Sequence, residues 1–131
     1  LEKVEKRGVD IVCNQFEYHP FLNQDKLLAK TREMGCFATA YAPLAKGQVV
    51  DIEILQYIAL KHKVKPAQVA LRWLVQQEDV VAIPKSSQLY RIKQNFDVFN
   101  FHLDEEDMEK ISALQSKNMR LIDPEFAPTW D

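Results

Sequence analysis

The sequence predicts an α/β fold in which short parallel strands alternate with helices. Three short runs, residues 9–14, 36–41 and 80–84, are rich in Val, Ile, Phe and Tyr and are bounded by residues that break regular structure. Each run contains consecutive apolar residues, which is typical of strands buried on both faces. Helical patterns lie between and after the runs, and this alternation favours right-handed βαβ units and a parallel sheet.

The helical segments carry recognisable start and stop signals. Asn23 is a capping residue at the start of the segment that Gly35 ends. Pro66 suits the first turn of a later helix. Asp104 caps the last helix, with Asp107 at the reciprocal capping position. The predicted helical segments are residues 1–7, 23–34, 51–62, 66–77, 88–98 and 104–114. Residues 116–131 show no clear period and are predicted to form a surface loop.

Composition narrows the possible functions. The chain has 131 residues, of which 47% are hydrophobic and 27% charged, with a formal net charge of −2. This charge gives no general attraction to nucleic acid or anionic lipid, and no apolar run approaches the roughly 18 residues of a membrane helix. Cys13 and Cys36 lie in apolar runs without metal-binding spacing, so we expect buried thiols, no metal site and a cytoplasmic protein.

The predicted sheet is too small to be complete. Three strands with apolar faces would leave two open edges and an uncovered inner face. A closed barrel of alternating strands and helices needs eight strands and about 250 residues. We therefore expect the chain to be part of something larger, either truncated or completed by a partner.

Polar residues follow each predicted strand, at the ends where parallel α/β sheets bind ligands. Gln15 follows the first strand and Tyr41 ends the second. The third is followed by Lys85 and Ser86, and we expect a helix opening near Ser87 whose free N–H groups favour an anion. Arg91 lies one turn into that helix. This set suits a phosphate, although the spacing fits an ordinary capped helix with solvated charges equally well.

Three motifs carry a family resemblance. C-N-Q-F-E-Y-H-P at residues 13–20, A-Y-A-P-L-A-K-G at 40–47, and I-P-K-S-S at 83–87 followed by R-I-K-Q-N at 91–95 resemble the aldo-keto reductases. Within that family, the motifs resemble most the bacterial diketogluconate and methylglyoxal reductases, and the ending A-P-T-W-D is part of this resemblance. The resemblance implies a (β/α)8 barrel, with residues 1–131 forming strands six to eight and the C-terminal tail.

The resemblance also implies binding of NADPH along the strand ends. Gln15 would bond the nicotinamide carboxamide while Asn14 supports the strand end, and Tyr41 would stack on the nicotinamide ring. Ala42 and Leu44 would line the path of the pyrophosphate.

The adenosine end of the cofactor would lie at the third strand. Lys85, Ser86 and Arg91 would hold the 2′-phosphate, which favours NADPH over NADH. Asn95 and Gln94 would contact the adenine. At the position of Gln94, members of the family often have Glu.

No catalytic residue is expected in this chain. The family uses Asp, Tyr, Lys and His on earlier strands, which this sequence does not contain. Tyr57 and Lys61 are four residues apart on a helix and could touch, but we expect them on a solvated outer face. His19 is expected to be structural. Phe126 and Trp130 could either wall a substrate pocket or belong to a packed or frayed terminus.

Three hypotheses remain open at this stage. The first is an NADPH-dependent reductase of small aldehydes or ketones, with this chain supplying the cofactor-binding portion. The second is a nucleotide-binding or regulatory module without turnover. The third, nucleic-acid binding through Tyr90, Arg91 and Lys93, is disfavoured by the negative net charge. The sequence leaves the oligomeric state open.

Overall fold

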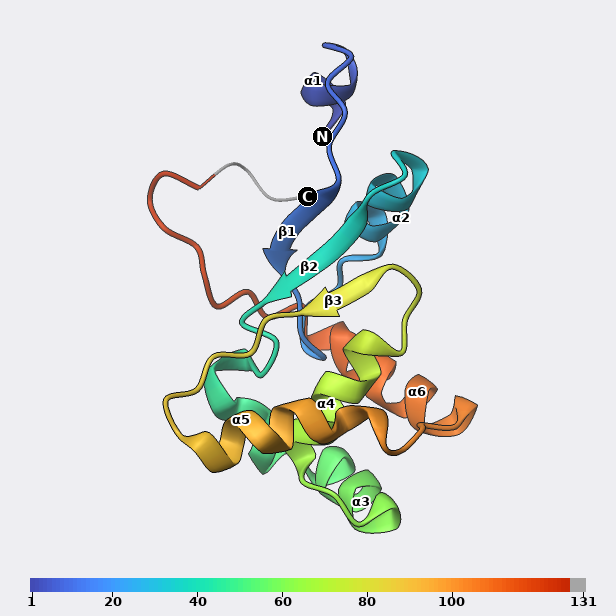
Figure 1. Ribbon diagram of the computed structural model, residues 1–131, viewed down its shortest axis with the longest axis vertical. Coiled ribbons are helices and arrows are strands. Elements are labelled where there is room, and N and C mark those ends of the chain that lie inside the picture. The colour runs from blue at the N-terminus through green and yellow to red at the C-terminus, as the bar shows by residue number, and fades with distance from the viewer. Residues whose placement is uncertain (128–131) are drawn as a thin grey trace.

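A computed structural model describes residues 1–127 of the chain and contains a three-stranded parallel sheet (Figure 1). The strand order is β1 (Cys13–Glu17), β2 (Phe37–Tyr41), β3 (Val80–Ala82), and both pairings are parallel. The predicted parallel α/β class is therefore confirmed. Because all three strands point the same way, their carboxyl ends lie at one edge of the sheet.

The helices fall close to the predicted segments. Their bounds are α1 (Glu2–Glu5), α2 (Asp25–Glu33), α3 (Glu53–His62), α4 (Pro66–Val75), α5 (Leu89–Phe96) and α6 (Glu105–Ser112), with 3₁₀ segments η1 (Ala45–Asp51), η2 (Asp97–Phe99) and η3 (Ala113–Lys117). The short α1 lies at one end of the molecule (Figure 1), where its Glu5 forms an ion pair with Lys30 of α2 at 2.8 Å. Within residues 1–127, no helix is both long enough and apolar enough to cross a membrane.

The first strand is displaced from its predicted position at residues 9–14. It begins at Cys13 because pairing with β2 decides its place: Cys13 lies opposite Phe37 and Glu17 opposite Tyr41. The apolar side chain of Val12 is left 76% exposed before the strand. The displacement brings Gln15 inside the strand rather than after it.

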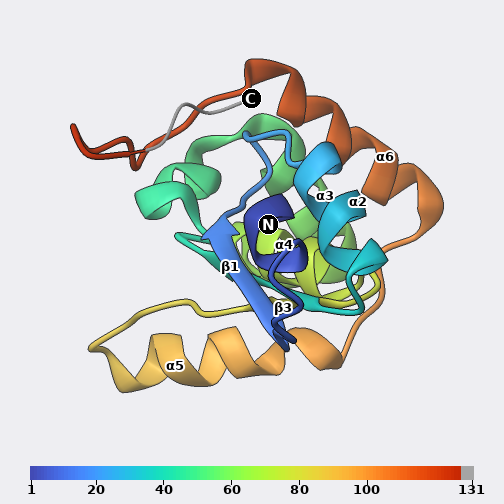
Figure 2. The same cartoon turned by 90° about the horizontal axis from the view of Figure 1, so that it is seen from above.

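Helix α4 is the centre of the hydrophobic core. It contacts β3, α3, α5 and α6, and α5 and α6 lie on opposite sides of it (Figure 2). Trp73 is buried, its ring centroid lies 5.3 Å from that of Tyr18, and its Nε1 donates to Ser112 Oγ at 3.1 Å. A helix that is apolar on nearly all sides is expected only where neighbours surround it.

The two faces of the sheet differ in burial. Phe16, Ala38 and Val80 point to the helix-covered face and are buried. On the opposite face, Phe37 and Val81 remain 37% and 43% exposed. Successive side chains of a strand point to opposite faces, so this second face, here called the uncovered face, carries exposed apolar side chains, although Thr39 and Glu17 on it are buried. This agrees with the expectation from the sequence that three strands alone would leave an inner face without a complete cover.

A matched pair of leucines tests the assignment of the core. Leu74 is fully buried in α4, whereas Leu60 in α3 is 80% exposed. We expect Leu74→Ala to lower the free energy of unfolding by roughly 2–5 kcal/mol through lost burial and a cavity. Leu60→Ala should change it by less than about 0.5 kcal/mol. Urea unfolding followed by circular dichroism measures both, and equal effects would contradict this core.

Candidate functional site

A cavity of about 850 Å³ lies where the chain leaves β2 and β3. Its walls come from the residues after β2 and η1, from the start of α4, and from the segment after β3 with α5. Seven of the nine predicted site residues line it: Ala42, Leu44, Lys85, Ser86, Arg91, Gln94 and Asn95. The fold thus gathers residues from two loops that are some forty positions apart in the sequence.

The charged groups that line this cavity are all cations. They are Lys46, Lys65, Lys85 and Arg91, and no Asp or Glu is among the lining residues. The whole chain carries a formal net charge of −2, so the cavity concentrates positive charge against the overall balance. Such a lining attracts anions and raises their local concentration.

The helix beside Ser86 starts later than the sequence predicts. The first residue of α5 is Leu89, and the Ser86 Oγ accepts a hydrogen bond from the Gln88 N–H at 3.1 Å. Ser86 therefore forms a turn before the helix instead of opening it. The intrahelical bonding of α5 begins with Ile92 N–H donating to the Gln88 carbonyl at 3.0 Å. The N–H groups that open the helix consequently belong to residues 89–91.

Arg91 is oriented by its neighbour. Its Nε donates to the Tyr90 hydroxyl at 3.0 Å, and its guanidinium carbon lies 5.7 Å from the centre of the Tyr90 ring. Among residues 1–127, no carboxylate forms an ion pair with Arg91. Its terminal nitrogens are therefore available to a ligand, and guanidinium groups suit phosphate oxygens.

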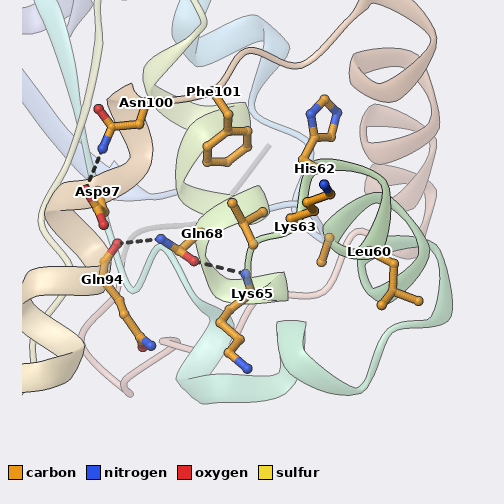
Figure 3. Close-up of a pocket in the computed structure, with 11 residues that line it drawn as sticks. Leu60, His62, Lys63, Lys65, Gln68, Gln94, Asp97, Asn100 and Phe101 are labelled. Atoms are coloured by element: carbon orange, nitrogen blue, oxygen red, sulfur yellow. Dashed lines mark hydrogen bonds between the residues drawn. The ribbon is translucent and has the colours of Figure 1, made fainter.

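Gln68, which the sequence analysis did not single out, joins two walls of the site (Figure 3). It is buried, its Oε1 accepts from the Lys65 N–H at 2.9 Å, and its Nε2 donates to the Gln94 carbonyl at 3.1 Å. A neighbouring cavity of about 610 Å³ shares Lys65, Gln68 and Gln94 with the first. Gln at the third position of a helix that opens with Pro66 is one half of a capping-box signal, but Lys65 stands where the signal has Ser or Thr, so the sequence pattern alone does not reveal this role.

Gln15 and Tyr41 do not line the cavity. Both lie on the uncovered face of the sheet, where Gln15 is exposed and Tyr41 is half-buried. Tyr41 immediately precedes Ala42, which does line the cavity, so the uncovered face and the cavity adjoin at this point. Burial raises the pKa of Tyr41, and the charge of Glu17 opposite it on β1 adds to the effect.

A buried carboxylate at the end of β1 holds the C-terminal segment. Glu17 and His19 are both 0% exposed, and the His19 Nε2 lies 2.8 Å from the Glu17 Oε1. Glu17 also accepts hydrogen bonds from the backbone N–H groups of Leu121 at 2.7 Å and Ile122 at 2.9 Å. Burial lowers the pKa of His19, while its hydrogen bond to Glu17 opposes this. The buried, paired position of His19 agrees with the predicted structural role.

The C-terminal segment also reaches the cavity. Lys46, which lines the cavity, donates from Nζ to the Leu121 carbonyl at 3.4 Å. Phe126 is 90% exposed. Trp130 lies outside the described residues.

The other side chains considered for catalysis have structural partners. Lys61 donates to Asp104, the residue before α6, and to Asp107 on α6. The Tyr57 ring instead lies 5.8 Å from the Lys110 Nζ. The predicted solvated face of α3 is therefore in part a contact with α6. The buried Asp107 carboxylate pairs with Lys61 and His62, so only the Asp104 half of the predicted capping box forms. In the part of the chain that the structure describes, no three His, Cys, Asp or Glu side chains gather to hold a metal.

A parallel α/β sheet with a positively lined cavity at its carboxyl edge is typical of proteins that bind phosphorylated ligands. Residues 1–116 match the model of the aldo/keto reductase family, and the chain belongs to this family. Its neighbours in that family have (β/α)8 barrels of which this chain corresponds to only about half.

Curated relatives and solved structures agree with this membership. The chain is 48% identical to glyoxal reductase of Bacillus subtilis over 113 residues, which are 86% of this chain and 41% of that protein. It is 38% identical to methylglyoxal reductase DkgB of Escherichia coli O157:H7, covering 93% of this chain and 45% of the relative. The crystal structure of a mutant of Gox0644 in complex with NADPH matches with a TM-score of 0.87 at 35% identity, covering 98% of this chain and 47% of that one. The chain thus spans less than half the length of these relatives.

The Glu17 cluster leads to a testable expectation. Glu17→Ala would leave the His19 ring and two backbone N–H groups without their acceptor, so we expect a loss of roughly 3 kcal/mol of stability. Hydrogen exchange of the Leu121 and Ile122 amides should accelerate. Glu125→Ala, at an exposed position of the same segment, is the control and should leave these amides unchanged. Unaltered exchange in Glu17→Ala would show that Glu17 does not hold the segment.

Proposed function

We propose that this chain supplies the cofactor-binding portion of an NADPH-dependent reductase that converts aldehydes or ketones to alcohols. The observation that carries the proposal is the convergence of seven predicted cofactor residues on one cavity with an all-cationic charged lining. Membership of the aldo/keto reductase family and the names of the reductases to which it is similar support the same reaction class. NADPH in the Gox0644 complex supports the choice of cofactor.

The adenosine end of NADPH would lie between α4 and α5. Lys85 and Arg91 would bind the 2′-phosphate, together with Ser86 and the N–H groups opening α5. Asn95 and Gln94 line the same cavity and would contact the adenine. NADH lacks the 2′-phosphate, so these cations would favour NADPH.

The nicotinamide end would lie on the uncovered face of the sheet. The cofactor would leave the cavity past Leu44 and Ala42 and reach Tyr41, whose ring offers a flat surface for stacking. Gln15, exposed on the same face, would bond the carboxamide. The bound cofactor would supply hydride to a carbonyl carbon, and Tyr41 and Gln15 would orient the ring for that transfer.

Catalysis would require further strands beyond those of this chain. We infer that residues 1–131 are strands six to eight of the barrel with the C-terminal tail, and that the Asp, Tyr, Lys and His of the family lie on preceding strands. The exposed apolar side chains of Phe37 and Val81 support this, because a completed barrel would cover them. Cys36 is buried as expected, whereas Cys13 is exposed, so the expectation of a buried thiol is wrong for Cys13. Both are free thiols, which fits a reducing compartment such as the cytoplasm.

The phosphate assignment can be tested in the protein that carries this chain. We expect Lys85→Gln and Arg91→Gln each to raise the Kd for NADPH roughly tenfold or more, since each removes a charged hydrogen bond to the phosphate. The Kd for NADH should change less than about twofold. Isothermal titration calorimetry measures both. Lys93→Gln is a matched control, because Lys93 is exposed on α5 and does not line the cavity. Equal losses for the two cofactors would refute the assignment.

Turnover provides an independent test. The 131-residue chain alone should show no NADPH oxidation with methylglyoxal or a nitrobenzaldehyde, followed by absorbance, because it lacks the catalytic acid. A protein that joins this chain to the preceding barrel strands should reduce these carbonyls. Activity of the isolated chain would contradict the proposed division of roles. Tight NADPH binding without turnover by the joined protein would indicate a nucleotide-binding module instead.

A further inference from the structure

Lys65 is a cation at the cofactor cavity that the motifs of the sequence do not single out. It is the residue immediately before α4 and lines the same cavity as Lys85 and Arg91. Among residues 1–127 its ammonium has no carboxylate partner, whereas Lys30, Lys61 and Lys110 each form ion pairs. Lys65 therefore presents an uncompensated charge to the cavity.

The position of this charge is unfavourable for the helix itself. The start of a helix carries partial positive charge, and side chains that accept hydrogen bonds are preferred there. Lys65 provides no side-chain cap. Its backbone carbonyl accepts from the Gln68 N–H at 2.9 Å, and its own N–H donates to the Gln68 side chain at 2.9 Å. The helix start is thus secured by the main chain and Gln68, without help from the ammonium group.

The Gln68 bridge holds the backbone of Lys65 beside α5. Gln68 bonds the backbones of Lys65 and Gln94 from opposite sides, so α4 and α5 are tied together here. The side chains of Lys65 and Gln94 extend to the same side of this bridge (Figure 3). Arg91 lies on α5 one turn before Gln94, and it lines the same cavity as Lys65.

We infer that Lys65 is a third basic group for the 2′-phosphate of the cofactor's adenosine, and hence a determinant of the preference for NADPH over NADH. The inference rests on the proposed function and adds a residue from a different helix to it. A phosphate between α4 and α5 would be met by Lys65 on one side and by Arg91 with Lys85 on the other. It would also relieve the unfavourable charge at the start of α4.

The test uses the protein that carries this chain, with NADPH, NADH and adenosine 2′,5′-bisphosphate as probes. Lys65→Gln should raise the Kd for NADPH and for the bisphosphate about fivefold and leave that for NADH within about twofold, as measured by calorimetry. Lys65→Arg should retain the preference. Lys63→Gln is the matched control, because Lys63 is exposed two residues away and lines the neighbouring cavity but not this one.

A second variant separates binding from folding. Lys65→Thr places a capping side chain at the start of α4, so thermal stability should be maintained or raised while the NADPH preference falls. Suppose that Lys65→Gln left the Kd of every probe unchanged while Arg91→Gln still weakened the binding of NADPH more than that of NADH. This result would overturn the role of Lys65 and leave the proposed function intact. Equal losses for NADPH and NADH would place Lys65 at the pyrophosphate and would also overturn the inference. If neither Arg91→Gln nor Lys65→Gln altered NADPH binding, the proposed function itself would fail.

Discussion

The parallel register of the three strands is the constraint on which the candidate site depends. Phe16 lies opposite Ala40, and Ala40 opposite Ala82, so each strand delivers the residue that follows it to the same edge. An antiparallel partner would have sent one of these ends to the far side of the sheet. The long crossover from β2 to β3 ends in α4, whose first turn borders the cavity at that edge, and α5, which follows β3, begins beside the same cavity.

The buried helix α4 connects the core to the site. Its apolar side chains fill the space between β3 and the surrounding helices, with Trp73 packed against Tyr18. Its polar start is held by Gln68, which also bonds the carbonyl of Gln94 on α5. Packing of the core and the width of the cavity are therefore determined by the same helix. A shift of α4 within the core would change the separation of the cations across the cavity.

The second face of the sheet is covered at one place and exposed at another, which bears on how the chain would fit into a larger protein. Val80 is buried against the helices while its neighbour Val81 is exposed on the other face of β3. Glu17, by contrast, is completely buried on that second face, because the C-terminal segment covers it and donates two N–H groups to it. The chain thus covers the carboxyl end of β1 by itself and leaves Phe37 and Val81 exposed on the same face.

Local patterns in the sequence predicted much of the fold. The apolar runs identified β2 and β3 to within two residues, and the breakers and caps located the helices, including Asp104, whose side chain accepts from the Asp107 N–H. Motif spacing identified seven residues that do line one cavity. These features are local, since a cap, a period or a motif is complete within a few residues.

What the sequence by itself determined is the order and type of the elements and which side chains follow each strand. Only the tertiary structure decided the start of β1, because the partner Phe37 is distant in the chain and selects Cys13. The same holds for the pairing of Asp107 with Lys61 and for the Gln68 bridge, since each joins residues that lie far apart in sequence. The positive charge of the cavity also depends on the fold, because folding brings four cations from separate segments to the walls of one cavity: Lys46, Lys65, Lys85 and Arg91.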